Sequence, residues 1–273
     1  KFISVLATGY NVIDVNYAKE KGIVVSNIPT YGTDCVGQFA IALLLEICHR
    51  IGHHDRAVKE GRWENAPDWC FWDYPLIELA GKTLGIIGFG RIGQKTGIIA
   101  KAMGMNVLAY DSHPNDKGRA IAEYVELDEI FAKSDVISLH CPLNPSTRHM
   151  INAKSIDKMK KGVFIINTSR GALIDSEALL YGLLNEKIGG ACLDVYEEES
   201  ELFYEDNSTA IVKDDILTRL ICLPNVIVTS HQGFLTGEAL TNIAATTLEN
   251  ISEFFADGSL DNQIILENSK KLV

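Results

Sequence analysis

The sequence has no apolar run that approaches the roughly 18 residues needed to span a bilayer. Residues 1–5 read as a strand and lack the basic start and longer apolar segment of a secretion signal. With 273 residues and 47% hydrophobic content, the chain can bury one large core or two modest ones. We therefore expect a soluble, cytoplasmic protein with no membrane partner.

Basic residues are also scarce, with 25 lysines and arginines against 36 acidic residues and a net charge of −11. This balance argues against a nucleic-acid partner, because binding a phosphate backbone needs positive charge. Much of the acidic excess lies between residues 197 and 215, which we expect to be a solvated loop.

Cysteine motifs and metal-ligand clusters are missing as well. The six cysteines form no CxxC pair and mostly sit in apolar runs, so we expect buried, reduced thiols. His49 and His53 would share a helix face, but no third ligand nearby has convincing spacing. No metal site is predicted.

A glycine-rich turn between a strand and a helix is what the sequence does contain. Residues 82–87 form a short apolar strand that runs into the Gly88–Gly93 turn, GFGRIG, and a helical pattern follows. Such glycines permit a tight turn, close approach to a pyrophosphate and close helix packing, with the anion at the helix N-terminus. Asp111 ends the next strand, 23 residues after Gly88, and can accept hydrogen bonds from ribose hydroxyls. The pattern predicts NAD binding in preference to NADP. The alternative is a turn that only packs a helix on a sheet.

Three later strands each end in an ionisable side chain. The apolar runs 163–166, 190–193 and 226–228 read as buried parallel strands, and they lead to Arg170, to the acidic block 194–199 and to His231. Ligands of open α/β sheets bind beyond the carboxyl ends of the strands, so an arginine, a carboxylate and a histidine would converge there. Arginine can clamp a substrate carboxylate, and histidine can transfer a proton near neutral pH.

Each of these residues also has a structural interpretation. Arg170 could be a surface residue at a helix end, and His231 could be a core histidine bonded to backbone. The choice of Glu199 over its acidic neighbours depends on the family resemblance given below. His140, which ends the strand at 134–139, is expected to shape the cofactor loop more than to take part in catalysis.

Strands and helical patterns alternate through the chain, which predicts a doubly wound parallel α/β sheet of the Rossmann type. We assign residues 32–234 to this NAD-binding domain. A long apolar helix at 35–59 is expected to form an interface, and the aromatic loop with Trp63, Trp69 and Trp72 is expected in the core, at an interface or in a neighbouring subunit's pocket. The last helix, 236–256, is expected to return to the N-terminal residues, so that 1–31 and 235–273 form a second, discontinuous domain.

Three blocks resemble the D-isomer-specific 2-hydroxyacid dehydrogenase family. They are residues 84–93 (LGIIGFGRIG), 135–143 (DVISLHCPL) and 159–175 (MKKGVFIINTSRGALID). The resemblance covers nearly the whole chain and implies a flavodoxin-like substrate domain, which would be N-terminally truncated here. It also implies a homodimer formed through the NAD domain.

The resemblance implies roles for particular residues. Arg170 would clamp the substrate carboxylate, Glu199 would pair with the catalytic histidine, and His231 would be the acid/base. Substrate-binding residues would be Thr8, Gly9, Tyr31 and Phe234. With the glycine motif, it places the cofactor on Gly88, Gly90, Arg91, Ile92, Gly93, Asp111, His140, Cys141, Pro142, Thr147, Thr168 and Asp194.

Two branches of the family are represented. Residues 31–38 and 67–72 resemble glycerate dehydrogenase (hydroxypyruvate reductase), whereas 201–206, 214–219 and 230–236 resemble D-lactate dehydrogenases. The expected reaction is reversible hydride transfer between NADH and a small 2-oxo acid, either pyruvate or hydroxypyruvate. Formate dehydrogenases rank low, because a carboxylate-paired histidine points to ketone reduction. The rival interpretation is a non-catalytic NAD(H) sensor that uses the same domains to bind proteins.

Overall fold

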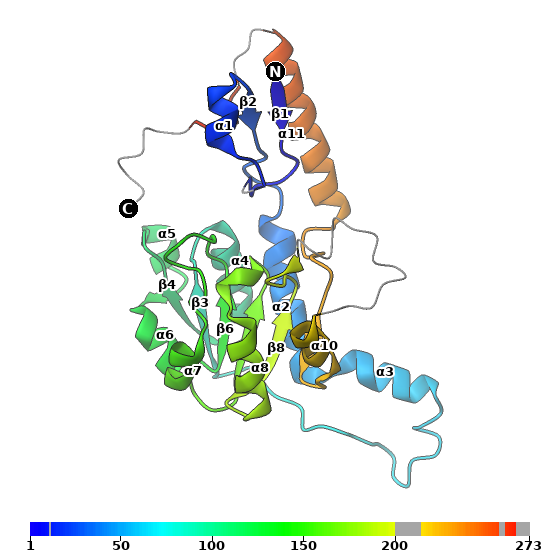
Figure 1. Cartoon of the computed structure of the whole chain (residues 1–273). Coiled ribbons are helices and arrows are strands. Elements are labelled where there is room, and N and C mark those ends of the chain that lie inside the picture. Colours follow the sequence, from blue (N-terminus) through cyan, green and yellow to red (C-terminus); the bar gives the residue numbers. More distant parts are fainter. Residues whose placement is uncertain (11, 200–213, 257–259, 266–273) are drawn as a thin grey trace. The chain divides into compact units, whose positions relative to one another are not determined.

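The computed structural model describes residues 1–10, 12–199, 214–256 and 260–265. The chain divides into two compact units, one of residues 1–35 with 234–273 and one of residues 36–233 (Figure 1). Each unit is described by itself. The functional assignment of the predicted domains, 1–31 with 235–273 and 32–234, stays a prediction. Most of the acidic segment expected as a solvated loop lies outside the described residues.

The larger unit contains a seven-stranded, fully parallel sheet in the order β5-β4-β3-β6-β7-β8-β9. This confirms the predicted doubly wound α/β fold. Its strands are β3 (Thr83–Ile87), β4 (Asn106–Tyr110), β5 (Glu123–Tyr124), β6 (Val136–Leu139), β7 (Val163–Asn167), β8 (Ile188–Leu193) and β9 (Val226–Val228). Its helices are α2 (Thr33–His49), α3 (Ile51–Lys59), α4 (Arg91–Ala102), α5 (Asp116–Arg119), α6 (Leu127–Lys133), α7 (Ala153–Lys158), α8 (Ser176–Leu184) and α10 (Asp215–Cys222), with a 3₁₀ turn at Gly171–Leu173.

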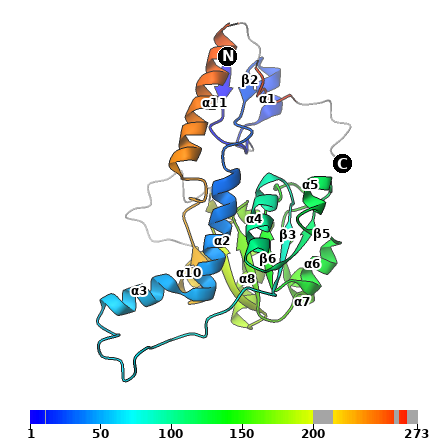
Figure 2. The same cartoon turned by 180° about the vertical axis from the view of Figure 1, so that it is seen from behind.

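Helices cover both faces of this sheet, and each face has its own core. One core packs α6, α7, α8 and α10 against the strands, and the other packs α2 and α4 (Figures 1 and 2). The middle strands are buried at all or all but one of their residues; β6, for example, has four buried residues out of four. A strand covered on both faces favours apolar side chains at most positions, which explains the near-continuous apolar runs of the sequence.

The strand order reverses between β3 and β6. In doubly wound sheets this reversal opens a crevice beyond the carboxyl ends of the two strands, where ligands bind. The Gly88 turn follows β3 and the His140–Cys141 segment follows β6. The fold therefore places the predicted cofactor motif at the reversal point.

The single helix expected over residues 35–59 is wrong. The structure has two helices, α2 and α3, with a bend of 56° between them. Arg50 breaks the helix with a left-handed φ of 53°, and the Glu46 carboxylate accepts from the Gly52 amide at the start of α3. A sequence pattern of helical residues on both sides hides such a break.

Within the described residues, no single helix is both long and apolar enough to cross a membrane. Helices α2 and α3 would meet the length and composition requirement only as a bent pair.

The smaller unit pairs two short parallel strands, β1 (Phe2–Ser4) and β2 (Val24–Ser26). Helix α1 (Val15–Glu20) connects them, capped by the Asp14 side chain, and the chain returns in α11 (Gly237–Ala256). Asn250 of α11 is buried and donates to the Asn27 carbonyl, while Phe254 stacks on Phe2. The predicted return of the last helix to the N-terminal residues is thus confirmed.

Candidate active site at the carboxyl ends of the sheet strands

The Gly88–Gly93 turn is formed by close backbone approaches that only glycine permits. Gly88 has a φ of +89°, and a Cβ there would lie 2.4 Å from the Cys141 nitrogen. A Cβ on Gly93 would lie 2.3 Å from the Gly88 carbonyl oxygen. The turn after β3 therefore packs directly on the segment after β6 and on the first turn of α4, where Arg91 and Ile92 lie.

Asp111 braces this turn from the end of β4. Its carboxylate accepts from the Phe89 amide at 2.6 Å and from the His113 amide at 2.8 Å. Each carboxylate oxygen has more than one lone pair, so Asp111 keeps acceptor capacity for hydroxyl groups of a ligand. This arrangement fits its predicted contact with ribose hydroxyls.

The start of α4 has room for an anionic ligand. Gly90 is the N-cap without a side-chain cap, and a Cβ added to it would meet nothing within 4 Å. Among the described residues, the buried Thr168 hydroxyl at the end of β7 has no hydrogen-bond partner. A dinucleotide with its pyrophosphate on the helix N-terminus fits these features.

His140 lies partly buried beside this turn. Its Nε2 lies 2.9 Å from the Ser138 hydroxyl, and its amide donates to the Ile87 carbonyl at 2.8 Å. Burial lowers the pKa of His140 to about 4, so the ring stays neutral near neutral pH. A neutral, enclosed ring agrees with a role in shaping the cofactor loop.

The loop after β6 is fixed from two sides. The Thr147 hydroxyl donates to the Pro142 carbonyl, and the Ser169 hydroxyl donates to the Cys141 carbonyl, both at 2.7 Å. Burial raises the pKa of the Cys141 thiol to about 11, so this thiol remains protonated and unreactive. The contacts of Cys141, Pro142 and Thr147 with a cofactor stay predictions.

Arg170 follows β7 in a turn organised by Asn167, which is fully buried. The Asn167 amide nitrogen donates to the Arg170 carbonyl at 2.8 Å, and its oxygen accepts from the Ser169 amide at 3.0 Å. The Arg170 guanidinium donates to the Ser169 carbonyl at 2.7 Å through Nη1. The buried Asn167 side chain therefore fixes the backbone at Arg170.

Asp194 ends β8 and holds the loop that carries His231. It is 3% exposed. One carboxylate oxygen accepts from the Thr229 hydroxyl at 2.6 Å and the Gln232 amide at 2.9 Å, and the other accepts from the Gly233 amide at 2.8 Å. These three bonds make Asp194 the anchor of residues 229–233; its predicted contact with the nicotinamide end of NAD stays a prediction.

The structure brings His231 and Glu199 together. The His231 Nδ1 lies 3.2 Å from the Glu199 Oε1, with side chains 36% and 21% exposed. His231 has a left-handed φ of 53°, and its amide donates to the Asp194 carbonyl at 2.8 Å. The other Glu199 oxygen accepts from the Tyr196 amide at 3.2 Å. A partly exposed histidine held by a carboxylate can exchange a proton with a ligand.

The four predicted substrate-binding residues all lie in the smaller unit. The Thr8 hydroxyl donates to the Ile28 carbonyl at 2.8 Å, and Gly9 follows it in the same loop. The rings of Tyr31 and Phe234 meet edge to face, with centroids 6.1 Å apart. Their roles toward a substrate stay predictions.

Sequence reasoning did not find the residues that join these loops. Asn167, His149 and Glu197 have no motif that marks them individually, although all three lie in or beside the recognised blocks. His53, considered above as a metal ligand, instead pairs with Asp73 at 2.6 Å. Hydrogen-bond partners far apart in the sequence could be identified only from the structure.

Comparison with known proteins agrees with this architecture. The sequence model of the family described as D-isomer specific 2-hydroxyacid dehydrogenase, NAD binding domain, matches residues 41–233. A hydroxypyruvate reductase of Blautia hydrogenotrophica is 53% identical over 93% of this chain and 75% of that protein. The D-lactate dehydrogenase of Escherichia coli is 41% identical over 97% of this chain and 79% of that protein. The solved structure of the pyruvate reductase of Chlamydomonas reinhardtii, 39% identical, superposes with a TM-score of 0.87 over 96% of this chain and 78% of that chain.

The fold and the site define a dinucleotide-binding α/β oxidoreductase. The chain belongs to the D-isomer-specific 2-hydroxyacid dehydrogenase family, and its cofactor is NAD.

Proposed function

We propose that the chain reduces a small 2-oxo acid with NADH and oxidises the corresponding D-2-hydroxy acid with NAD, using Arg170, Glu199 and His231. The pairing of His231 with Glu199 at 3.2 Å carries this proposal. A histidine held by a carboxylate is suited to proton transfer, and the arginine of the neighbouring loop is suited to bind a carboxylate through two parallel hydrogen bonds.

In this mechanism the bound dinucleotide supplies or accepts the hydride. Arg170 binds the substrate carboxylate, which orients the carbonyl group. Protonated His231 donates its proton to the carbonyl oxygen as negative charge develops there, and neutral His231 takes the hydroxyl proton in the reverse direction. Glu199 contacts the ring at Nδ1, and we assign the proton exchange with substrate to Nε2.

We propose pyruvate and hydroxypyruvate as the substrates to test first. The similarity to a hydroxypyruvate reductase and to a D-lactate dehydrogenase supports both. Phe234 beside Tyr31 would give an apolar wall, which suits the methyl group of pyruvate. The groups that would bind the hydroxyl group of hydroxypyruvate are not identified by these contacts.

The test is an assay of NADH oxidation with pyruvate, hydroxypyruvate and glyoxylate. We expect turnover with at least one of them, and a fall of kcat/KM by at least ~100-fold in Arg170→Lys with an increase in KM, because lysine cannot form the bidentate contact. Absence of turnover with all three acids, while NADH still binds, would instead favour a non-catalytic NAD(H) sensor.

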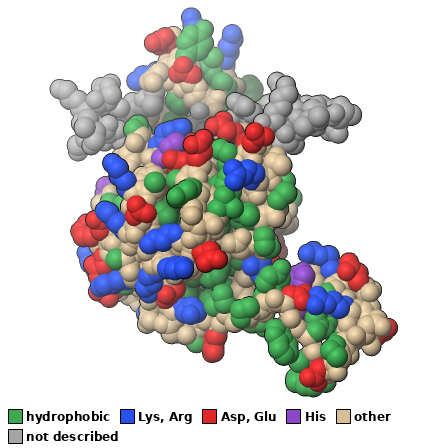
Figure 3. All heavy atoms as spheres, turned by 60° about the horizontal axis from the view of Figure 1, so that its bottom comes forward, with side chains coloured by type: hydrophobic (Ala, Val, Ile, Leu, Met, Phe, Trp, Pro, Cys, Tyr) green, Lys and Arg blue, Asp and Glu red, His purple; other side chains and the backbone are tan. Residues whose placement is uncertain are grey.

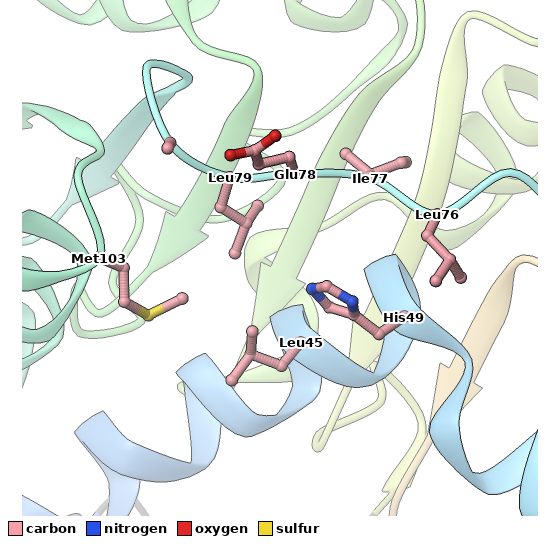
Figure 4. Close-up of a pocket in the computed structure, with 8 residues that line it drawn as sticks. Leu45, His49, Leu76, Ile77, Glu78, Leu79 and Met103 are labelled. Atoms are coloured by element: carbon pink, nitrogen blue, oxygen red, sulfur yellow. The ribbon is translucent and has the colours of Figure 1, made fainter.

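We also propose a homodimer formed through the larger unit and a cytoplasmic location. Trp63, Trp69 and Trp72 are more than half exposed on the segment after α3, where hydrophobic side chains gather at the lower right of Figure 3. A groove of about 370 Å³ lies along the chain that returns from this segment to β3. Its lining comes from α2, residues 76–80 and Met103 (Figure 4). Exposed apolar surface of this kind is typical of an interface.

Sedimentation analysis tests the dimer: Trp69→Ser with Trp72→Ser should shift the protein toward a monomer. An unchanged dimer in that variant would contradict an interface on this segment.

The proposed cytoplasmic location is supported by the cysteines. All six are free thiols, which is typical of a reducing compartment.

A further inference from the structure

The Glu197 carboxylate lies where three chain segments meet, next to the proposed catalytic residues. Its side chain is only 12% exposed. One oxygen accepts from the His149 Nε2 and from the Arg148 Nη2, the latter at 3.3 Å. The other oxygen accepts from the Ser176 hydroxyl at 3.2 Å and its amide at 3.4 Å. Glu197 therefore joins its own loop after β8 to the segment at 148–149 and to the start of α8.

The contact with Ser176 fixes the helix that follows Arg170. Ser176 is buried and is the first residue of α8, and the preceding Asp175 caps the same helix by accepting from the Ala178 amide at 3.0 Å. A second carboxylate at this helix start satisfies a further free amide and is favoured by the helix dipole. Only five residues separate Ser176 from Arg170, so fixing one end of this stretch restricts the other.

His149 links a third segment to the same stretch. Its amide donates to the Ala172 carbonyl at 2.9 Å, and the Ile151 amide donates to the Leu173 carbonyl at 3.1 Å. His149 has a left-handed φ of 50°, and the Asn152 side chain donates to its carbonyl at 2.7 Å. The backbone thus presents the imidazole to Glu197 while it pairs with the residues just after Arg170.

Gly171 brings the two catalytic loops into direct contact. A Cβ on Gly171 would lie 2.0 Å from the Tyr196 carbonyl carbon and 2.4 Å from the Glu197 nitrogen. The Tyr196–Glu197 peptide therefore packs against the residue next to Arg170. Two residues after Glu197, the Glu199 carboxylate accepts a hydrogen bond from the Tyr196 amide at 3.2 Å. A shift of Glu197 would move the neighbours of both Arg170 and Glu199.

We propose that Glu197, held by His149, is a positioning residue that fixes the arginine that clamps the substrate relative to the carboxylate that pairs with the catalytic histidine. This inference rests on the proposed roles of Arg170 and Glu199. The proposed role requires no contact of Glu197 with substrate or cofactor. The Glu197 carboxylate acts through its hydrogen bonds, which hold the loop after β7, the loop after β8 and the 148–152 segment in fixed positions relative to one another.

Kinetics of Glu197→Gln and Glu197→Ala test this role. We expect kcat/KM for the 2-oxo acid to fall ~10- to 100-fold, because misplacing catalytic groups by about 1 Å has costs of this order. The KM for NADH should change less than about twofold, since the glycine turn is carried by β3 and β4. Glu198→Gln is the matched control: Glu198 is the exposed neighbour, its charge change is identical, and its kinetics should match the unmodified chain.

A second variant identifies the partner. His149→Asn alone should reproduce most of the Glu197→Gln loss, and the double variant should be no worse than the worse single one, because both break the same link. Additive losses would overturn the pairing. Glu197→Gln kinetics equal to Glu198→Gln, or a loss spread equally over NADH and 2-oxo acid, would overturn the positioning role.

Hydrogen exchange separates this inference from the proposed function. If the unmodified chain turns over no 2-oxo acid, the proposed function fails, and peptides covering 168–175 and 194–199 then decide the positioning role. Faster exchange there in Glu197→Gln than in Glu198→Gln would support it, and equal exchange would overturn it. If Glu197→Ala does not fold, Glu197→Gln and His149→Asn carry the test.

Discussion

Around the Gly88–Gly93 turn the backbone itself forms the site, whereas around Arg170, Glu199 and His231 three separate loops are tied together by side chains. The cofactor side depends on glycines that let chain segments approach within 2.3–2.4 Å of where a Cβ would lie. The catalytic side depends on Asn167, which bonds to the backbone of its own loop, and on Asp194 and Glu197, which each bond to backbone of a neighbouring segment. Substitutions that add side-chain volume at the glycines should therefore disrupt the cofactor side. Substitutions that remove hydrogen-bond acceptors should disrupt the catalytic side.

The largest effect should come from the proton-transfer residue. His231→Asn removes the ring that faces Glu199, and we expect kcat to fall ~10²- to 10⁴-fold, the usual contribution of general acid–base catalysis. NADH affinity, measured by fluorescence titration, should change less than about threefold, because the cofactor side is built separately. A similar loss in kcat and in NADH binding would contradict the separation of the two sides.

Adding volume should break the cofactor side in two distinguishable ways. Gly88→Ala places a Cβ against backbone at a left-handed φ, so we expect ~2–4 kcal/mol loss in the free energy of unfolding. The Cβ added by Gly90→Ala would have no protein atom within 4 Å, so this variant should fold normally. It should bind NADH more weakly, because the Cβ would occupy space assigned to the cofactor. Urea titrations and NADH titrations measure the two losses. Equal stability of both variants would show that the close approach at Gly88 is not rigid.

Removing acceptor capacity should break the catalytic side. Asp194→Asn puts an amide nitrogen opposite one of the donors from Thr229, Gln232 and Gly233, so we expect ~1–3 kcal/mol loss in unfolding free energy and a reduced kcat. Thr229→Val removes only one donor and should cost less. Stability that is unchanged in Asp194→Asn would mean that the 229–233 loop has another anchor.

The smallest effect concerns pH and the partly buried His140. Its pKa is about 4 in the folded chain against 6.5 as the ordinary value, so the unfolded chain binds more protons between these two values. The contribution of His140 to stability is therefore complete above pH 6.5 and is lost as the pH falls toward 4. We expect ~1 kcal/mol of this loss between pH 6.5 and 5.5. His140→Gln should lose less stability over that interval; equal pH dependence would contradict a ring held neutral in the folded chain.

Much of the fold could be predicted because its signals are local. The apolar runs predict β3, β4 and β6–β9. The break at Arg50 was missed, because a left-handed residue between two helical patterns leaves no composition change. The short elements β5, α5 and α6 were also missed, since two to seven residues are too few for a periodic pattern.

The site divides in the same way. Arg170, Glu199 and His231 were found because strand ends and family motifs mark them, and the structure pairs two of them directly. Glu197 and His149, 48 positions apart, form a contact that no periodicity records. An acidic run at 197–199 gives no hint that the Glu197 side chain is 12% exposed while the next residue is exposed.

The sequence alone determined the chain's class: a strand, a glycine turn, a helix and an acid specify dinucleotide binding, since these parts act within about thirty residues. It also determined which residue types could perform the chemistry. Only the tertiary structure decided how those residues are held, because their supports are hydrogen bonds between loops that follow different strands. Parallel strands bring these loops to one edge of the sheet, and buried acceptors then fix their positions.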